Sequence, residues 1–274
     1  MSRNVLALAL AAALLACSGG SKGISVSART ADGTPTAATA LDLDNGIVLE
    51  RVRLVVREVE VEGGDAGAAC PGDDSAPSPA GAGVVPLHDG DDGEDDGEDC
   101  DDGLEFGPFL VDLSGAELAG GVHWAFDVPV PAGTYEELEV KVNTLPVGKA
   151  AGNAGLAEMA ALHASVAVNG TIDGVPFLYT APMEIEQERE DELVVDAETA
   201  PNLTLDVDPT GWFGGTGDAR LDPRDPTDEG AIRAAIRASI RLDRDDDHDG
   251  CDDDGDDDRC DPDDDDGDDG PGDT

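Results

Sequence analysis

The sequence predicts a mainly β protein: an antiparallel β-sandwich with one short C-terminal helix and disordered acidic segments. Two observations favour this fold class. Short apolar runs recur at steady spacing between residues 106 and 207 and are divided by turn residues, a pattern typical of sandwiches. Acidic residues gather in two Asp/Gly-rich stretches, 89–105 and 243–273, which cannot bury enough apolar area to fold.

The overall charge limits the classes of partner. The 274 residues include 63 acidic and 16 basic side chains, which gives a formal charge of −47. Such a polyanion repels phosphate groups, so nucleic acid is excluded as a partner, whereas cations are favoured. Aromatic residues make up 3% of the chain, so the core must be built from Val, Leu, Ile and Ala.

The chain divides into four parts. We expect a signal peptide at 1–17, a flexible linker at 18–40, and a β-sandwich domain at 41–242 with a disordered acidic insertion at 63–103. An acidic tail follows at 243–274. The first part has a basic Arg3 and then an apolar run that is too short to span a bilayer, which is the layout of a signal peptide.

The residues Leu14-Leu15-Ala16-Cys17 resemble a bacterial lipobox. The resemblance implies that Cys17 becomes a lipidated N-terminus and that the protein is anchored in the cell envelope. Ser18, which follows the cysteine, favours the outer membrane over the inner one. An ordinary secretory signal with an incidental Cys17 is the alternative.

Export makes disulfides possible for the remaining cysteines, Cys70, Cys100, Cys251 and Cys260. Three pairings exist. We favour Cys70–Cys100 with Cys251–Cys260, because the first would close the acidic insertion at its base. Zinc binding is the weaker alternative, since the cysteines lack paired C-x-x-C spacing.

The clearest strand is Ile47–Val61, which is dense in β-branched residues. Val48, Val52, Leu54 and Val56 share one face by period two, and a phase slip after them predicts a β-bulge. A helix is the alternative for this segment. Eight further strands are expected, at 106–113, 122–130, 134–145, 164–168, 171–179, 183–188, 193–195 and 202–207.

Turn and helix signals complete the prediction. Asn169-Gly170 and Asp173-Gly174 are both hairpin-type dipeptides. The segment 150–163 favours a short helix. The C-terminal helix is expected after Asp225 as N-cap, with Ile232, Ile236 and Ile240 recurring every four residues as its buried stripe.

The segment PVPAGTYEELEVKV at 129–142 resembles the turn and strand of transthyretin-like and carbohydrate-binding-like β-sandwich modules. The order of LTLDVDPTGWF, LDPRDP, IRAAIRASI and DDDHDG is similar to that in uncharacterised bacterial lipoproteins with a sandwich domain of unknown function. This resemblance implies the sandwich fold and an exported location. It carries no activity.

The start of the tail contains D-x-D-x-D-G, the spacing that wraps a loop around calcium. The candidate ligands are Asp245, Asp247, Asp249, Cys251 (through its carbonyl), Asp253 and Asp256. Asp stands where an EF-hand has its bidentate Glu, and no helix pattern follows. A helix-then-loop site or a thrombospondin-type-3-like repeat therefore fits better than an EF-hand. A solvated polyanion without a specific site is the alternative.

The sequence contains no nucleophile elbow, zinc-protease motif or phosphate-binding glycine loop, so we expect a non-enzymatic protein. The predicted function is a binding or structural module of the cell envelope with calcium as its cofactor. A carbohydrate-binding module is the alternative, which exposure of Tyr179 and Trp212 on one face would support. Carbohydrate or another envelope protein is the possible partner.

Overall fold

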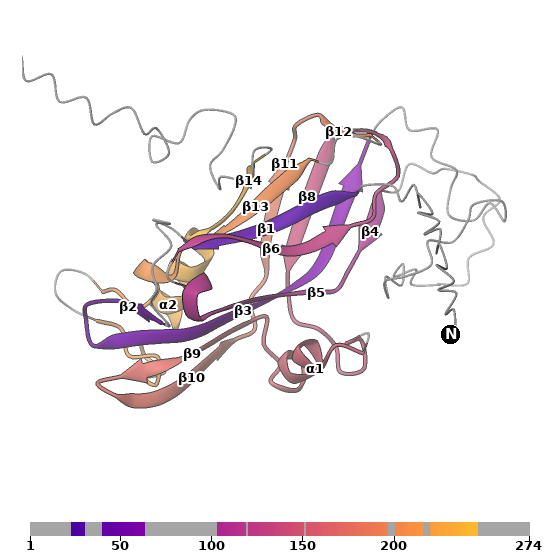
Figure 1. Ribbon diagram of the computed structural model, residues 1–274. Coiled ribbons are helices and arrows are strands. Elements are labelled where there is room, and N and C mark those ends of the chain that lie inside the picture. Colours follow the sequence, from indigo (N-terminus) through magenta and orange to yellow (C-terminus); the bar gives the residue numbers. More distant parts are fainter. Residues whose placement is uncertain are drawn as a thin grey trace, which may run out of the picture.

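The computed structural model describes residues 23–30, 40–63, 103–118, 120–150, 152–196, 201–215 and 220–245, and shows a mainly β fold of two facing sheets (Figure 1). The smaller sheet has the order β14 (Ile240–Arg244), β13 (Asn202–Val207), β1 (Ile24–Thr30) and β6 (Gly121–Val128). The path of the larger sheet is β10 (Val175–Ala181), β9 (Val166–Ile172), β3 (Ile47–Glu62), β8 (Glu137–Val142) and β11 (Ile185–Arg189).

Smaller elements complete the described fold. Three more strands pair with β3, namely β2 (Leu41–Asp42), β4 (Leu104–Phe106) and β5 (Phe109–Ser114). A separate two-stranded sheet joins β7 (Gly133–Tyr135) and β12 (Leu193–Val195). The helices are α1 (Ala154–Ala161) and α2 (Glu229–Ala238), with 3-10 turns η1 (Gly115–Glu117) and η2 (Pro209–Gly211). None of the helices in the described residues is long and apolar enough to cross a membrane.

The central strand β3 confirms the strand prediction for 47–61 and the bulge within it. Its pairing with β8 shifts between Val56 and Glu58, where the buried side chains change phase. A second shift, between Leu49 and Arg51 in the pairing with β9, puts Leu49 and not Val48 on the core side. Figure 1 shows β3 running the length of the molecule, so that most of the larger sheet is built on it.

One buried core lies between the two sheets. Val26 and Leu205 of the smaller sheet and Val52 and Val140 of the larger sheet belong to the same cluster of buried residues. The shared core makes the fold a β-sandwich, as the sequence predicted. A second small cluster, around Val55 and α1, lies on the outer side of the larger sheet.

Two boundaries and one strand direction of the prediction need correction. The expected linker contains β1, which pairs with β6 and β13 and has Ile24 and Val26 in the core. The β1–β13 pair is parallel, so the sandwich is not wholly antiparallel. At the other end, the folded chain continues past 242, because β14 extends to Arg244. Of the acidic stretches expected to be disordered, Glu105 lies in β4 and Asp243 in β14, whereas residues 64–102 and 246–274 lie outside the described residues.

The C-terminal helix forms but begins and ends differently from the prediction. Asp228 is the N-cap residue of α2, while the Asp225 carboxylate accepts hydrogen bonds from Thr227 in a turn before the helix. Ile232 and Ile236 are buried as predicted. Ile240 instead starts β14, where it pairs with Val207 of β13. The segment 150–163 contains α1, capped by the Asn153 side chain.

The hairpin between β9 and β10 turns at Asp173-Gly174 and not at Asn169-Gly170. Asp173 and Gly174 have φ values of 51° and 76°, as a two-residue hairpin turn requires. Gly170 lies inside β9, where an added Cβ would come within 2.3 Å of the Val48 carbonyl oxygen. Glycine is needed there for close packing.

Candidate metal site

Four glutamates form a row across four neighbouring strands of the larger sheet. Glu105 on β4 pairs with Glu60 on β3. Glu60 pairs in turn with Glu139 on β8, which pairs with Glu188 on β11. Directly paired residues project from the same face of a sheet, and adjacent strands lie about 4.8 Å apart. The row therefore places one carboxylate on each of these four strands, on the same face of the sheet.

Further charged residues lie on the same surface, which we call the acidic face. On β3 and β8 they alternate with buried Val59, Val61, Leu138 and Val140, so they must point away from the core. The members are Glu58, Glu60, Glu62, Glu105, Glu137, Glu139, Lys141, Glu186 and Glu188. Eight glutamates thus share one lysine, and like charges directly opposite one another are destabilising.

The single lysine is held by three carboxylates. The Lys141 ammonium lies 2.9 Å from Glu58, 2.8 Å from Glu60 and 2.8 Å from Glu139. Burial acts to lower the pKa of Lys141, but hydrogen bonds to these three glutamates outweigh it and raise the pKa well above its ordinary value. Lys141 therefore stays protonated and serves as an internal counter-ion.

Three carboxylates, two of which contact Lys141, have the spacing that a divalent cation needs. Glu58, Glu60 and Glu105 each offer an oxygen, and these oxygens lie within 4.8 Å of one another. Calcium–oxygen distances are about 2.3–2.6 Å, so two ligand oxygens on opposite sides of one ion are about 5 Å apart. Three carboxylates and water could hold one calcium ion beside the lysine.

Ionisation is already unfavourable at the rim of the acidic face. Desolvation raises the pKa of Glu62, and the neighbouring carboxylates Glu60 and Glu139 raise it further. Desolvation, followed by the charges of Glu188 and Glu62, likewise raises the pKa of Glu137. The part of both pKa shifts that the neighbouring carboxylates cause indicates that the face holds more negative charge than its one lysine compensates, which a bound cation would relieve.

Helix α1 covers the other part of the same side of the sheet. Leu156, Met159 and Ala160 of α1 pack with Val55 of β3. Arg53, two residues before Val55, is 1% exposed and its guanidinium lies 2.9 Å from the Glu158 carboxylate. Beyond the bulge the outer residues of β3 are glutamates, half-buried at Glu58 and Glu60 and exposed at Glu62.

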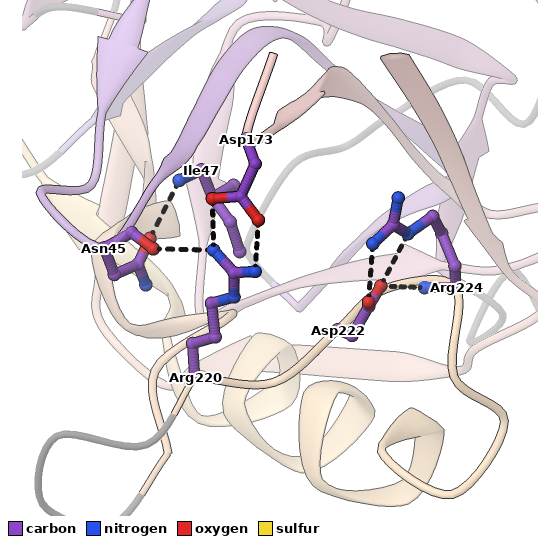
Figure 2. Close-up of polar contacts among 6 residues, drawn as sticks. All are labelled: Asn45, Ile47, Asp173, Arg220, Asp222 and Arg224. Atoms are coloured by element: carbon purple, nitrogen blue, oxygen red, sulfur yellow. Dashed lines mark hydrogen bonds and ion pairs between the residues drawn. The ribbon is translucent and has the colours of Figure 1, made fainter. Parts of the chain in front are cut away.

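A second group of charged residues differs from the acidic face because each carboxylate has its own arginine (Figure 2). Arg220 donates two hydrogen bonds to Asp173, at 2.9 and 2.5 Å, and a third to the carbonyl of Asn45 at 3.1 Å. Hydrogen bonds from Arg224 lower the pKa of Asp222 to about 2. The Arg220–Asp173 pair fastens the segment before α2 to the β9–β10 turn, and the Arg224–Asp222 pair lies within that segment, so both pairs indicate a structural role.

The structure describes one residue of the predicted calcium loop. Asp245 is fully buried, and its carboxylate accepts hydrogen bonds from the Thr204 hydroxyl at 2.6 Å and the Asn202 amide at 3.4 Å. Its backbone N–H donates to the carbonyl of Asn202 at 3.0 Å. The structure therefore shows Asp245 as an anchor of the tail on β13.

The other predicted site residues lie outside the described residues. They are the lipidation site Cys17, the cysteines Cys70, Cys100, Cys251 and Cys260, and the loop residues Asp247, Asp249, Asp253 and Asp256. The lipid anchor, the disulfide pairing and the rest of the calcium loop therefore stay predictions.

The aromatic residues that would have favoured sugar binding are buried. Tyr179 is 4% exposed, and Trp212 is fully buried and donates a hydrogen bond from its indole to the Ser239 hydroxyl at 2.5 Å. The Tyr179 ring packs edge-to-face against the buried Phe213 ring, and Trp212 directly precedes Phe213 in the sequence. Trp124 of β6, in contrast, is 65% exposed.

Comparison with known proteins identifies no relative. No family model matches the chain, and neither the curated proteins nor the solved structures include a match.

The acidic face as a whole was not predicted from the sequence. The alternating charged residues in EVEVE at 58–62 and ELEVK at 137–141 were a usable signal, because such alternation places all of them on one side of a strand. The sequence does not contain the register that brings Glu60 opposite both Glu105 and Glu139. Only the folded sheet aligns them.

Proposed function

We propose that the protein is a non-enzymatic module of the bacterial cell envelope, anchored by a lipid on Cys17, that binds calcium through carboxylates. The row of glutamates across β4, β3, β8 and β11 is the observation that carries the proposal. The acidic tail supplies a second set of candidate ligands, with Asp247 and Asp249 in the D-x-D-x-D-G spacing.

Calcium suits the acidic face better than magnesium. Calcium accepts six to eight oxygen ligands in flexible geometry, whereas magnesium demands an octahedron with short bonds and keeps its waters. Carboxylates on adjacent strands are spaced by the sheet and cannot close into a tight octahedron. By analogy with extracellular modules we expect a dissociation constant on the order of 10⁻⁴–10⁻³ M.

A calorimetric calcium titration of the purified protein tests the proposal, with magnesium at matched ionic strength as the control. The variant Glu60→Gln/Glu139→Gln removes two charges from the acidic face while keeping size and shape. The variant Asp247→Asn/Asp249→Asn removes the same number from the tail. The two variants have equal net charge, so a difference between them reports the position of the site and not the total charge.

We expect a saturable, calcium-selective signal that the Glu60→Gln/Glu139→Gln variant loses. Loss in the Asp247→Asn/Asp249→Asn variant alone would move the site to the tail. Binding that is equally strong for magnesium and weakens equally in both variants would reduce the acidic residues to a solvated polyanion and end the proposal.

The envelope location is tested separately. The wild type expressed in a bacterial host should incorporate labelled fatty acid and partition with membranes, and Cys17→Ala should do neither. If the label is absent and the wild type is recovered as a soluble exported protein, the secretory-signal alternative holds.

A further inference from the structure

One tryptophan is exposed in a protein whose other aromatic rings are buried or partly buried. Both tryptophans, both tyrosines and all five phenylalanines lie within the described residues, and Trp124 is the only one more than about one third exposed. Its exposed fraction is 65%. The indole N–H donates to the Asp127 carboxylate at 2.9 Å, which fixes the ring and leaves its face open.

A β-bulge turns this side chain outward. In the pairing with β1, Phe126 faces Val26 and Trp124 faces Ser27, so Ala125 is an extra residue in β6. On a regular strand Trp124 would lie on the same side as Phe126, which is buried in the core. Bulges re-aim side chains in this way and are frequent at binding sites.

The bulge lies at a cavity of about 180 Å³ between β5 and β6. Each of these strands is at an edge in the described sheets, since β6 ends the smaller sheet and β5 pairs only with β3. Ala28 and Leu113 contribute apolar walls. Edge strands also present backbone N–H and C=O groups that no neighbouring strand uses.

Polar groups converge on the same cavity. Asp112, Glu117 and His123 line it together with Trp124. Arg51 holds Asp112 by two hydrogen bonds, at 2.7 and 2.5 Å. The Nε2 atom of His123 is shielded from solvent and forms no hydrogen bond in the described part of the chain. A buried polar atom of this kind normally has a partner, so a ligand hydroxyl is a suitable one.

We propose that this cavity binds one pyranose ring of a neutral carbohydrate, with the ring stacked on Trp124. A pyranose has an apolar C–H face, which fits an open indole, and a rim of hydroxyls, which can donate to Asp112, Glu117 and Nε2 of His123. The cavity is smaller than the roughly 300–1,000 Å³ of pockets for drug-sized ligands, which limits the site to a single ring. This site is separate from the acidic face.

Titration with chitotetraose, cellotetraose and laminaritetraose, followed by tryptophan fluorescence and calorimetry, tests the proposal. Trp212 is fully buried, so acrylamide quenching reports mainly on Trp124. We expect at least one of the three sugars to bind saturably, with a dissociation constant on the order of 1 mM for so small a contact, and to protect Trp124 from acrylamide.

Variants separate this site from a general surface effect. Trp124→Ala should weaken binding at least tenfold by calorimetry, Trp124→Phe should retain most of it, and His123→Ala should weaken it several-fold. Leu178→Ala removes another exposed apolar side chain, on β10, and should leave binding unchanged. Thermal unfolding confirms that each variant is folded.

Three results would overturn the proposal: no saturation by any of the three sugars up to about 20 mM, binding that survives Trp124→Ala, or saturation by tetramethylammonium alone. The last result would assign the tryptophan and carboxylates to a cationic ligand. The calcium titration does not involve Trp124, so either proposal can fail while the other stands.

Discussion

Replacing Lys141 by methionine removes the only positive charge of the acidic face and keeps much of the side-chain length. Three contacts of 2.8–2.9 Å are lost, from a side chain that is 27% exposed to partners that are 18–20% exposed. Exposed ion pairs contribute about 0.2–1 kcal/mol each and hydrogen bonds to charged groups about 1.5–3 kcal/mol. The contributions of the three contacts are not additive because they share one ammonium, so we expect the free energy of unfolding to fall by about 2 kcal/mol. The melting temperature should fall by about 4–8 °C at neutral pH.

Thermal unfolding followed by circular dichroism measures this effect, with Lys149→Met as the control because Lys149 is an exposed lysine in a loop. The pKa of Lys141 is raised, so its contribution is present at neutral pH and is lost only as pH rises through that raised pKa. At about pH 3, where glutamates are mostly protonated, the ammonium has no anions to hold and the difference from wild type should shrink. An equal loss at both pH values would show that Lys141 acts by packing, which would refute the counter-ion argument.

The same variant connects the lysine to metal binding. Removing a like charge about 4 Å from a bound ion is worth at least about 1 kcal/mol even in water. Lys141→Met should therefore bind calcium about fivefold more tightly than wild type in calorimetry. Calcium should also restore much of its lost thermal stability. Weaker calcium binding by Lys141→Met would mean that the lysine organises the carboxylates and does not compete with the ion.

Three further predictions follow from single residues. The pKa of Glu137 is raised above its ordinary value of 4.5. This carboxyl therefore stabilises the fold at pH values below 4.5, and that contribution is lost as the pH rises through the raised pKa. Glu137→Gln should therefore be more stable than wild type at neutral pH and equal to it at about pH 4 in thermal unfolding. Glu158→Ala leaves buried Arg53 without its carboxylate and should cost about 2–3 kcal/mol in urea unfolding, whereas a change within 0.5 kcal/mol would show that water replaces the carboxylate. Gly170→Ala puts a Cβ 2.3 Å from the Val48 carbonyl oxygen and should cost about 1–3 kcal/mol by the same measurement, unless β9 can move away from β3.

Local sequence patterns predicted the strands well because β-branched alternation and turn residues act within a few positions. The strand 47–61 and its bulge follow from the phase of its valines, and both are present in β3. Strand β1 was missed because Ser25 and Ser27 alternate with its apolar residues, so its composition reads as a polar linker. The polar side of β1 is nevertheless buried, with the Ser27 hydroxyl bonded to Asn202 at 3.1 Å.

Residues whose role depends on distant partners could not be predicted in this way. Ile240 continues the four-residue repeat of α2, yet it is a strand residue because β13 is available to pair with it. The two Gly dipeptides of the β9–β10 region look alike in sequence, and the packing of Gly170 against β3 decides which one is the turn. The acidic face depends on the register between strands that are distant in the sequence, since Glu60 pairs with Glu139 and Glu139 pairs with Glu188.

The position of Asp245 links the acidic tail to the sandwich. A calcium loop that uses the Asp245 carboxylate must break its hydrogen bond to Thr204 and the bonds that join it to Asn202, because the side chain is fully buried. Calcium bound in that way would loosen the end of β14 and speed amide exchange at Asn202 and Asp245. Calcium bound by later tail residues, or on the acidic face, would leave these contacts intact and the exchange unchanged or slower. Hydrogen exchange with and without calcium therefore decides whether Asp245 is a ligand or only the point where the tail leaves the fold.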